Sequence, residues 1–196
     1  IQMAVMISAI ANGGTVLWPR LVDRIEPQDT TSGEAAKQFP AGLVRDRLDV
    51  HPRNLQIIRD AMLQDVANSE GSGTAAAVEG YQICGKTGTA QVISAEGKEK
   101  ATNKSALKNN AWFVGFAPRR NAEIVVAVLV QAGGYGAEAA APVARDVVKA
   151  YYDKKAGTYK GPQEYASNPQ KPAAVPTSPT ATAQAAPATA NSASRP

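Results

Sequence analysis

The chain has 196 residues and 44% of them are hydrophobic, which is enough for one globular domain with an apolar core. Its formal net charge is +4, but Lys and Arg form no long run, so the charge pattern gives no support for nucleic-acid binding. A single Cys and a single His exclude a disulfide within the chain and a zinc site. No apolar run reaches about 18 residues, so we expect no membrane-spanning helix within this sequence.

The first predicted helix begins at the start of the sequence and ends at Asn12-Gly13-Gly14, where glycine suits a left-handed cap. Its large side chains surround the helix, so it should be well buried. They are Met3, Val5, Met6, Ile7 and Ile10. Neither an initiating Met nor an N-cap residue precedes this helix, and we therefore expect the sequence to start inside a larger protein.

Two segments without helical periodicity follow. Residues 15–25 contain β-branched and aromatic residues and are predicted to be extended, with an interruption at Pro19. Residues 27–40 are polar and rich in turn-forming residues, which predicts a loop.

A second helix is predicted after Pro52, because apolar residues recur there at spacings of three and four. The resulting stripe consists of Leu55, Ile58, Met62 and Val66. The Glu-Gly-Ser-Gly stretch at residues 70–73 is expected to end this helix. We interpret His51, directly before it, as a capping or packing residue rather than a catalytic one.

Three strands and a closing helix complete the predicted fold. The strands are expected at residues 81–93, 111–117 and 123–131. Residues 118–122 should join the last two strands as a hairpin, and Arg119-Arg120 indicate a solvated turn. The closing helix is expected over residues 139–152. These elements predict an α+β fold with an antiparallel sheet packed against helices.

The composition changes at Ala156. Residues 156–196 consist mostly of Pro, Ala, Thr, Ser, Gln and Asn, and they contain no Leu, Ile or Phe. Such a segment cannot bury enough apolar surface to offset its chain entropy. We therefore predict an ordered part over residues 1–155 and a disordered tail over residues 156–196.

Residues 80–87 read Gly-Tyr-Gln-Ile-Cys-Gly-Lys-Thr and match the nucleotide-binding P-loop letter for letter. That motif needs a compact loop after a strand and a helix that opens at its Lys-Thr pair. Here Tyr and Ile in the middle suit a strand, and the Gly, Thr, Val and Ile residues that follow also favour a strand. We therefore prefer a strand to an ATP-binding loop.

Lys86-Thr87-Gly88 also resembles the Lys-Thr-Gly motif of the serine penicillin-recognising enzymes. Its flanks extend the match, with Thr-Ala-Gln directly after it, an Asn-Ala-Trp-Phe-Val-Gly-Phe-Ala-Pro strand, and Ala-Ala-Pro-Val-Ala-Arg opening the closing helix. The sequence resembles class B penicillin-binding proteins over residues 1–152. It looks most like the penicillin-binding protein 2 subfamily of side-wall elongation, with a septal-type relative as the alternative. The functionless interpretation is an exposed edge strand with a gatekeeping lysine.

In that family the motif lies on a sheet-edge strand beside the catalytic serine, and it binds a peptide with a free carboxylate. The resemblance implies that Lys86 supplies the positive charge and that Thr87 and Thr89 both donate to the carboxylate. Gly88 would let the substrate backbone approach, and the N–H of Thr89 would be one oxyanion-hole donor. Cys84 on the same strand is interpreted as a small buried apolar residue.

The family's nucleophile is the serine of a Ser-x-x-Lys motif. Ser105-Ala106-Leu107-Lys108 fits these letters, but it lies downstream of Lys86 in a polar stretch, whereas the family's motif lies far upstream on a buried helix. We interpret it as a solvated connection, and the family's Ser-x-Asn motif is absent. We therefore expect no nucleophile in this chain and no acylation or turnover by the chain alone.

The resemblance implies that the parent protein is a peptidoglycan D,D-transpeptidase without a metal or organic cofactor. Its serine would attack the penultimate D-alanine carbonyl of a stem peptide, release the terminal D-alanine and pass the acyl group to a neighbouring amine. β-Lactams would acylate the same serine. The family further implies a cytoplasmic-membrane anchor, a catalytic domain on the outer side of that membrane, and cell-elongation membrane proteins as partners.

Two alternatives stay open. One is a non-catalytic module that uses this sheet to bind proteins of the elongation machinery. The other is a related serine β-lactamase, which the Pro/Ala-rich tail and the Trp-Phe-Val-Gly-Phe strand disfavour. A Ser-x-x-Lys and a Ser-x-Asn motif upstream of Ile1 would discriminate between an enzyme and a binding module.

Overall fold

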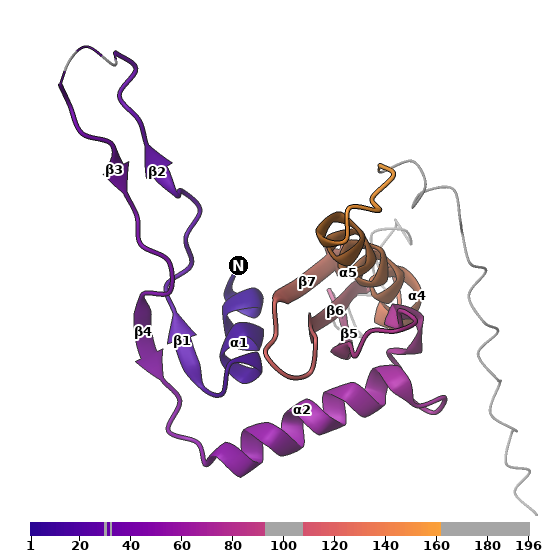
Figure 1. The fold of residues 1–196 in the computed structure, drawn as a ribbon. Helices are drawn as coiled ribbons and strands as arrows, with labels where there is room; N and C mark the ends of the chain where they lie inside the picture. Colours follow the sequence, from indigo (N-terminus) through magenta and orange to yellow (C-terminus); the bar gives the residue numbers. More distant parts are fainter. Residues whose placement is uncertain (30, 32, 93–107, 162–196) are drawn as a thin grey trace, which may run out of the picture.

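The computed structural model describes residues 1–29, 31, 33–92 and 108–161. Figure 1 shows a small sheet, helices packed around it, and a long two-stranded arm that projects away from it. Most of the predicted tail, residues 162–196, lies outside the described residues, as does Ser105. Among the described helices, none combines the length and the apolar character that a membrane crossing needs.

A three-stranded antiparallel sheet in the order β5-β6-β7 forms the centre of the fold. Its strands are β5 (Cys84–Ala90), β6 (Asn110–Ala117) and β7 (Ile124–Val130). The central strand β6 is buried along most of its length, whereas β5 at the edge is exposed or half-buried from Lys86 onward. The α+β fold with an antiparallel sheet, predicted from the sequence, is confirmed.

Helices cover both faces of this sheet. On one face lie α1 (Gln2–Ala11) and α2 (Pro52–Ala67), which pack Ile7 and Met62 against Phe116. On the other face lie α5 (Ala141–Lys155) and the short 3-10 helix η1 (Thr74–Ala76), which enclose Phe113. Because alternate residues of a strand point to opposite faces, β6 contributes large side chains to both apolar clusters. The edge strand β5 is thereby held between two layers of helices.

Phe113 fixes the position of β5. Gly85 and Gly115 oppose each other across β5 and β6. A Cβ on Gly85 would lie 2.2 Å from Cζ of Phe113, and a Cβ on Gly115 would lie 3.0 Å from Cε1 of the same ring. The ring is fully buried and has no space to move into. The two glycines therefore let the ring lie against the backbone directly before Lys86.

The arm consists of two antiparallel strand pairs. β1 (Thr15–Leu17) pairs with β4 (Val44–Arg47), and β2 (Arg24–Ile25) pairs with β3 (Lys37–Gln38). The extended segment predicted over residues 15–25 contains β1 and β2, but the loop predicted over residues 27–40 was wrong at its end, where β3 forms. Both β3 and β4 are exposed along their whole length, so they lack the apolar alternation that predicts a strand.

The closing helix predicted over residues 139–152 corresponds to α5, and the short helix α4 (Gly136–Ala139) precedes it. Pro142 explains the break between α4 and α5, because its ring nitrogen has no hydrogen and cannot donate to the carbonyl of Glu138. A new helix therefore begins with Pro142 in its first turn. At the start of α2, the N–H of Arg53 donates to Nδ1 of His51 at 3.2 Å, which confirms the capping interpretation of that histidine.

Candidate functional site

Strand β5 carries the Lys-Thr-Gly-Thr sequence along the edge of the sheet. Lys86 opposes Val114 on β6, Thr87 opposes Phe113, and Thr89 opposes Ala111. Thr87 and Thr89 therefore belong to the same face of the strand, as the sequence predicted. Because Lys86-Thr87 lies inside a strand and no helix opens there, the P-loop interpretation is excluded.

Lys86 lies in a cluster of oxygen atoms from three other side chains. Its Nζ donates to Oγ of Ser72 at 2.9 Å and to Oγ1 of Thr87 at 3.2 Å. It also lies 3.4 Å from Oδ1 of Asp65, and the Lys86 side chain remains 57% exposed. An exposed ammonium group that is already oriented by neighbouring hydroxyls can bind an anion without first being ordered.

Ser72 connects the members of this cluster. Its hydroxyl donates to Oδ1 of Asp65 at 2.9 Å, and its Oγ lies 2.6 Å from Oγ1 of Thr87. Its backbone N–H donates to the same Oδ1 at 3.2 Å. The sequence analysis missed Ser72 and Asp65 as site residues. Residues 70–73 were interpreted only as the end of the helix, and Asp65 was not singled out. The one available signal was a serine between two glycines, shortly after an aspartate that lies beside the apolar stripe of the helix.

The glycines around Ser72 are required by close packing against α2. A Cβ on Gly71 would lie 2.1 Å from the backbone carbonyl oxygen of Asp65. A Cβ on Gly73 would lie 2.7 Å from Oδ2 of the same residue. The backbone N–H of Gly73 donates to the carbonyl of Asp65 at 2.9 Å, which closes the loop onto the end of the helix. This tight return brings Ser72 to the edge of β5.

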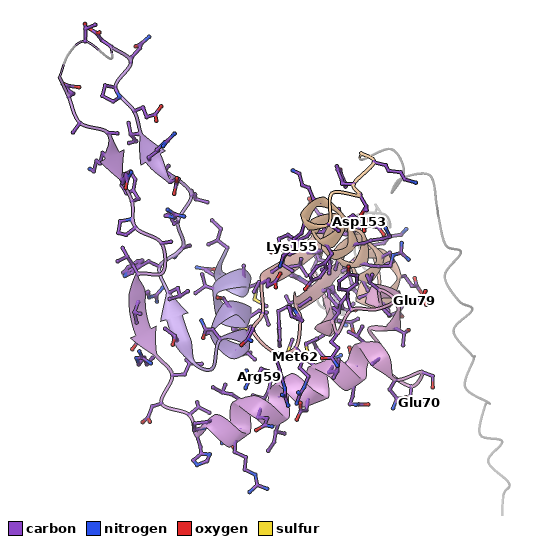
Figure 2. The ribbon with its side chains drawn as sticks, in the orientation of Figure 1. Arg59, Met62, Glu70, Glu79, Asp153 and Lys155 are labelled. Atoms are coloured by element: carbon purple, nitrogen blue, oxygen red, sulfur yellow. The ribbon has the colours of Figure 1, made fainter. Side chains whose placement is uncertain are left out.

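The polar cluster borders an open groove of about 860 Å³ between α1, α2 and the sheet. Most of the groove is apolar, with Met3, Met6, Ile10, Ile58, Met62 and Trp112 among its lining residues. Figure 2 shows Met62 on the side of α2 toward the sheet, and the loop with Glu70 at the far end of that helix. Lys86, Thr87 and Thr89 also line this groove, so one ligand could contact the charge and the apolar wall together.

Two residues near the site have structural roles. Cys84 is completely buried, and burial raises the pKa of its thiol from 9.0 to about 11, so it is inert packing as predicted. Arg119 was predicted to lie in a solvated turn, and this was wrong, because its Nε donates to Oδ1 of Asp60 at 2.7 Å. The guanidinium, 20% exposed, ties the β6–β7 hairpin to α2.

Comparison with known proteins identifies the family. Residues 1–149 match the family model described as penicillin binding protein transpeptidase domain. This chain belongs to the penicillin-binding protein transpeptidase family. The resemblance to class B penicillin-binding proteins that Lys86-Thr87-Gly88 and its flanks carry is therefore confirmed.

Individual members of the family show how much of a whole protein the chain represents. It is 30% identical over 162 residues to the peptidoglycan D,D-transpeptidase MrdA of Haemophilus influenzae, which covers 79% of this chain and 24% of that protein. The D,D-transpeptidase domain of a peptidoglycan glycosyltransferase from Eggerthella lenta superposes with a TM-score of 0.61 at 30% identity, covering 79% of this chain and 32% of that one.

A third similar protein was solved with a ligand. Penicillin-binding protein A from Mycobacterium tuberculosis, as its ceftriaxone acyl-enzyme complex, matches with a TM-score of 0.53 and 29% identity. The match covers 74% of this chain and 30% of that one. The chain thus spans from a quarter to a third of the length of these relatives.

Proposed function

We propose that the protein which carries this chain is a peptidoglycan D,D-transpeptidase, and that this chain supplies the strand that binds the substrate carboxylate. One observation carries the proposal: the ammonium group of Lys86 and the hydroxyls of Ser72 and Thr87 lie within 3.2 Å of one another at the exposed edge of β5. Membership of the transpeptidase family and the names of the relatives support it.

The chemistry of this cluster suits the free C-terminus of a stem peptide. A carboxylate accepts charge-assisted hydrogen bonds, which are stronger than bonds between neutral groups. Lys86 would provide the charge, and the hydroxyls of Thr87 and Thr89 would provide oriented donors. Gly88 would leave room for the peptide backbone, and the N–H of Thr89 would stabilise the oxyanion that forms during acyl transfer.

The reaction also needs a nucleophile, which we place outside this chain. Its serine would attack the penultimate D-alanine carbonyl, release D-alanine and transfer the acyl group to an amine of a neighbouring stem. Ser105 begins a sequence that fits Ser-x-x-Lys, and it lies outside the described residues. We propose that Ser105 is not the nucleophile. β-Lactams would acylate the same serine, and penicillin-binding protein A forms an acyl-enzyme complex with ceftriaxone.

The remaining parts of the proposal follow from the family. We propose a membrane anchor elsewhere in the protein, a catalytic domain on the outer side of the cytoplasmic membrane, and partners among cell-elongation membrane proteins. A penicillin-binding protein 2-like role in side-wall growth is our preferred subtype. Residues 1–155 would form the C-terminal part of the transpeptidase domain, and residues 156–196 would form a disordered tail.

Covalent labelling tests the proposal. The longer protein and this chain are each incubated with a fluorescent penicillin, denatured and resolved on a gel. We expect a labelled band for the longer protein and none for the chain. A binding module would leave both unlabelled, a β-lactamase would release the label within seconds to minutes, and a stable adduct on Ser105 would refute the placement of the nucleophile.

A further inference from the structure

Asp65 stands out because the loop after α2 packs against both its backbone and its carboxylate. The side chain is 16% exposed, and its Oδ1 accepts from the backbone N–H and the hydroxyl of Ser72. Its Oδ2 is buried and, within the described residues, has no hydrogen-bond partner. Gly71 and Gly73 lie so close to Asp65 that a Cβ on either glycine would clash with it. The fold therefore holds the carboxylate of Asp65 in a fixed position next to Ser72.

This position decides the direction of the hydroxyl protons. Ser72 has a single hydroxyl hydrogen and two lone pairs. When that hydrogen points to Asp65, the lone pairs of Ser72 face Nζ of Lys86 at 2.9 Å and the hydroxyl of Thr87 at 2.6 Å. Ser72 then acts only as an acceptor toward the strand, and Lys86 is held in one place between Ser72 and Thr87. Without a ligand the hydroxyl hydrogen of Thr87 points to Ser72, and it turns away from Ser72 to donate to a bound carboxylate.

We propose that Asp65 is a positioning residue that acts through Ser72 on Lys86 and Thr87, and so sets the preference of the site for a carboxylate. The inference rests on the proposed function, because it concerns how the proposed carboxylate anchor is oriented. Asp65 itself does not contact the substrate. Its Oδ1 also lies 3.4 Å from Nζ of Lys86, a long contact that we expect to be weaker than the two hydrogen bonds that Oδ1 accepts from Ser72. The negative charge of Asp65 by itself would oppose an anionic ligand.

The test uses the longer protein and two ligands that differ in one group, benzylpenicillin and its carboxylate methyl ester. We define a selectivity ratio as the acylation rate with benzylpenicillin divided by the acylation rate with its methyl ester. In Asp65→Ala we expect this ratio to fall about tenfold, the range of a hydrogen bond to a charged group. In Asp65→Asn, whose amide oxygen can still accept both bonds from Ser72, the ratio should stay within about threefold of the wild type.

Two further variants separate positioning from general damage. Asp60→Ala removes a carboxylate from the same helix without touching Ser72, and it should leave the ratio unchanged. In a Ser72→Ala background, Asp65→Ala should have no additional effect on the ratio, because the two residues act in series. A structural defect would instead slow the acid and the ester equally.

The outcomes distinguish a failure of the proposed function from a failure of the inference about Asp65. A wild-type protein that is not acylated, or that reacts equally with acid and ester, would overturn the proposed function and this inference with it. A selective wild type with an unchanged ratio in Asp65→Ala would overturn the inference alone. The same holds if Asp65→Asn loses as much as Asp65→Ala, or if Asp65→Ala does not fold, since Asp65 would then serve charge or stability only.

Discussion

Gly136 at the start of α4 presses against Gly88 in the middle of β5, so closely that a Cβ on Gly136 would lie 2.5 Å from the carbonyl oxygen of Gly88. The same Cβ would lie 2.3 Å from the carbonyl oxygen of Trp112 on β6. Helix α4 thus contacts the backbone of the candidate site strand directly, from the face opposite the open groove.

We predict that Gly136→Ala destabilises the chain by about 1–3 kcal/mol, because the new methyl group meets backbone atoms that no side-chain rotation can clear. Urea unfolding of the chain followed by circular dichroism would measure this. Glu138→Ala, on the exposed side of the same short helix, should change stability by less than about 0.5 kcal/mol. Equal stability of Gly136→Ala and the wild type would contradict the packing of α4 on β5.

Lys86 should matter for ligand binding far more than for folding. In the longer protein we expect Lys86→Met to slow acylation by a carboxylate-bearing β-lactam about 100-fold, since truncating one partner of a charged contact typically costs several kcal/mol. The unfolding free energy of the chain should change little, because the Lys86 side chain is 57% exposed. Lys154→Met on the exposed end of α5 is the matched control, and a loss of the same size there would argue against a specific role for Lys86.

Cys84 should be protected from thiol reagents in the folded chain. Burial raises the pKa of its thiol from 9.0 to about 11, so at pH 9 it stays protonated when folded, although half of the unfolded molecules carry a thiolate. We expect labelling at pH 9 to be slow without urea and rapid with it. Because the folded pKa is the higher one, the stability contribution of Cys84 is present below pH 9 and is lost as the pH rises toward 11.

The Asp60–Arg119 pair should show measurable coupling. Arg119 is 20% exposed and Asp60 is 46% exposed, so solvent screens the pair only in part. A double-mutant cycle with Asp60→Ala and Arg119→Ala should give about 0.5–1 kcal/mol in urea unfolding. The neighbouring Arg120 is exposed, and Arg120→Ala should not couple to Asp60→Ala. No coupling between Asp60 and Arg119 would mean that the contact does not hold the hairpin to α2.

Patterns within a few residues predicted most of the sheet and its helices. The apolar run of β7 and the stripe of α2 each identify an element that packs locally, and Lys86, Thr87 and Thr89 occur together in one strand. Those predictions needed no information about distant parts of the chain.

Contacts between distant segments could not be predicted in this way. Ser72 reaches Lys86 only because the chain turns back tightly on the end of α2, and the closeness of Gly71 and Gly73 to Asp65 is a property of that turn. Arg119 likewise finds Asp60 across 59 positions of sequence. No local periodicity encodes such pairs, so charged residues in loops were interpreted as solvated.

The glycine pair at Gly85 and Gly115 has a consequence for how the site responds to its surroundings. The strand before Lys86 is located by the contact of its bare backbone with the buried Phe113 ring, and this contact involves no charge. Salt screens exposed ion pairs but leaves such steric contacts intact. High ionic strength should therefore weaken the attraction of an anion to the edge of β5 while the strand itself keeps its place, so that ligand binding and strand geometry respond independently to the solvent.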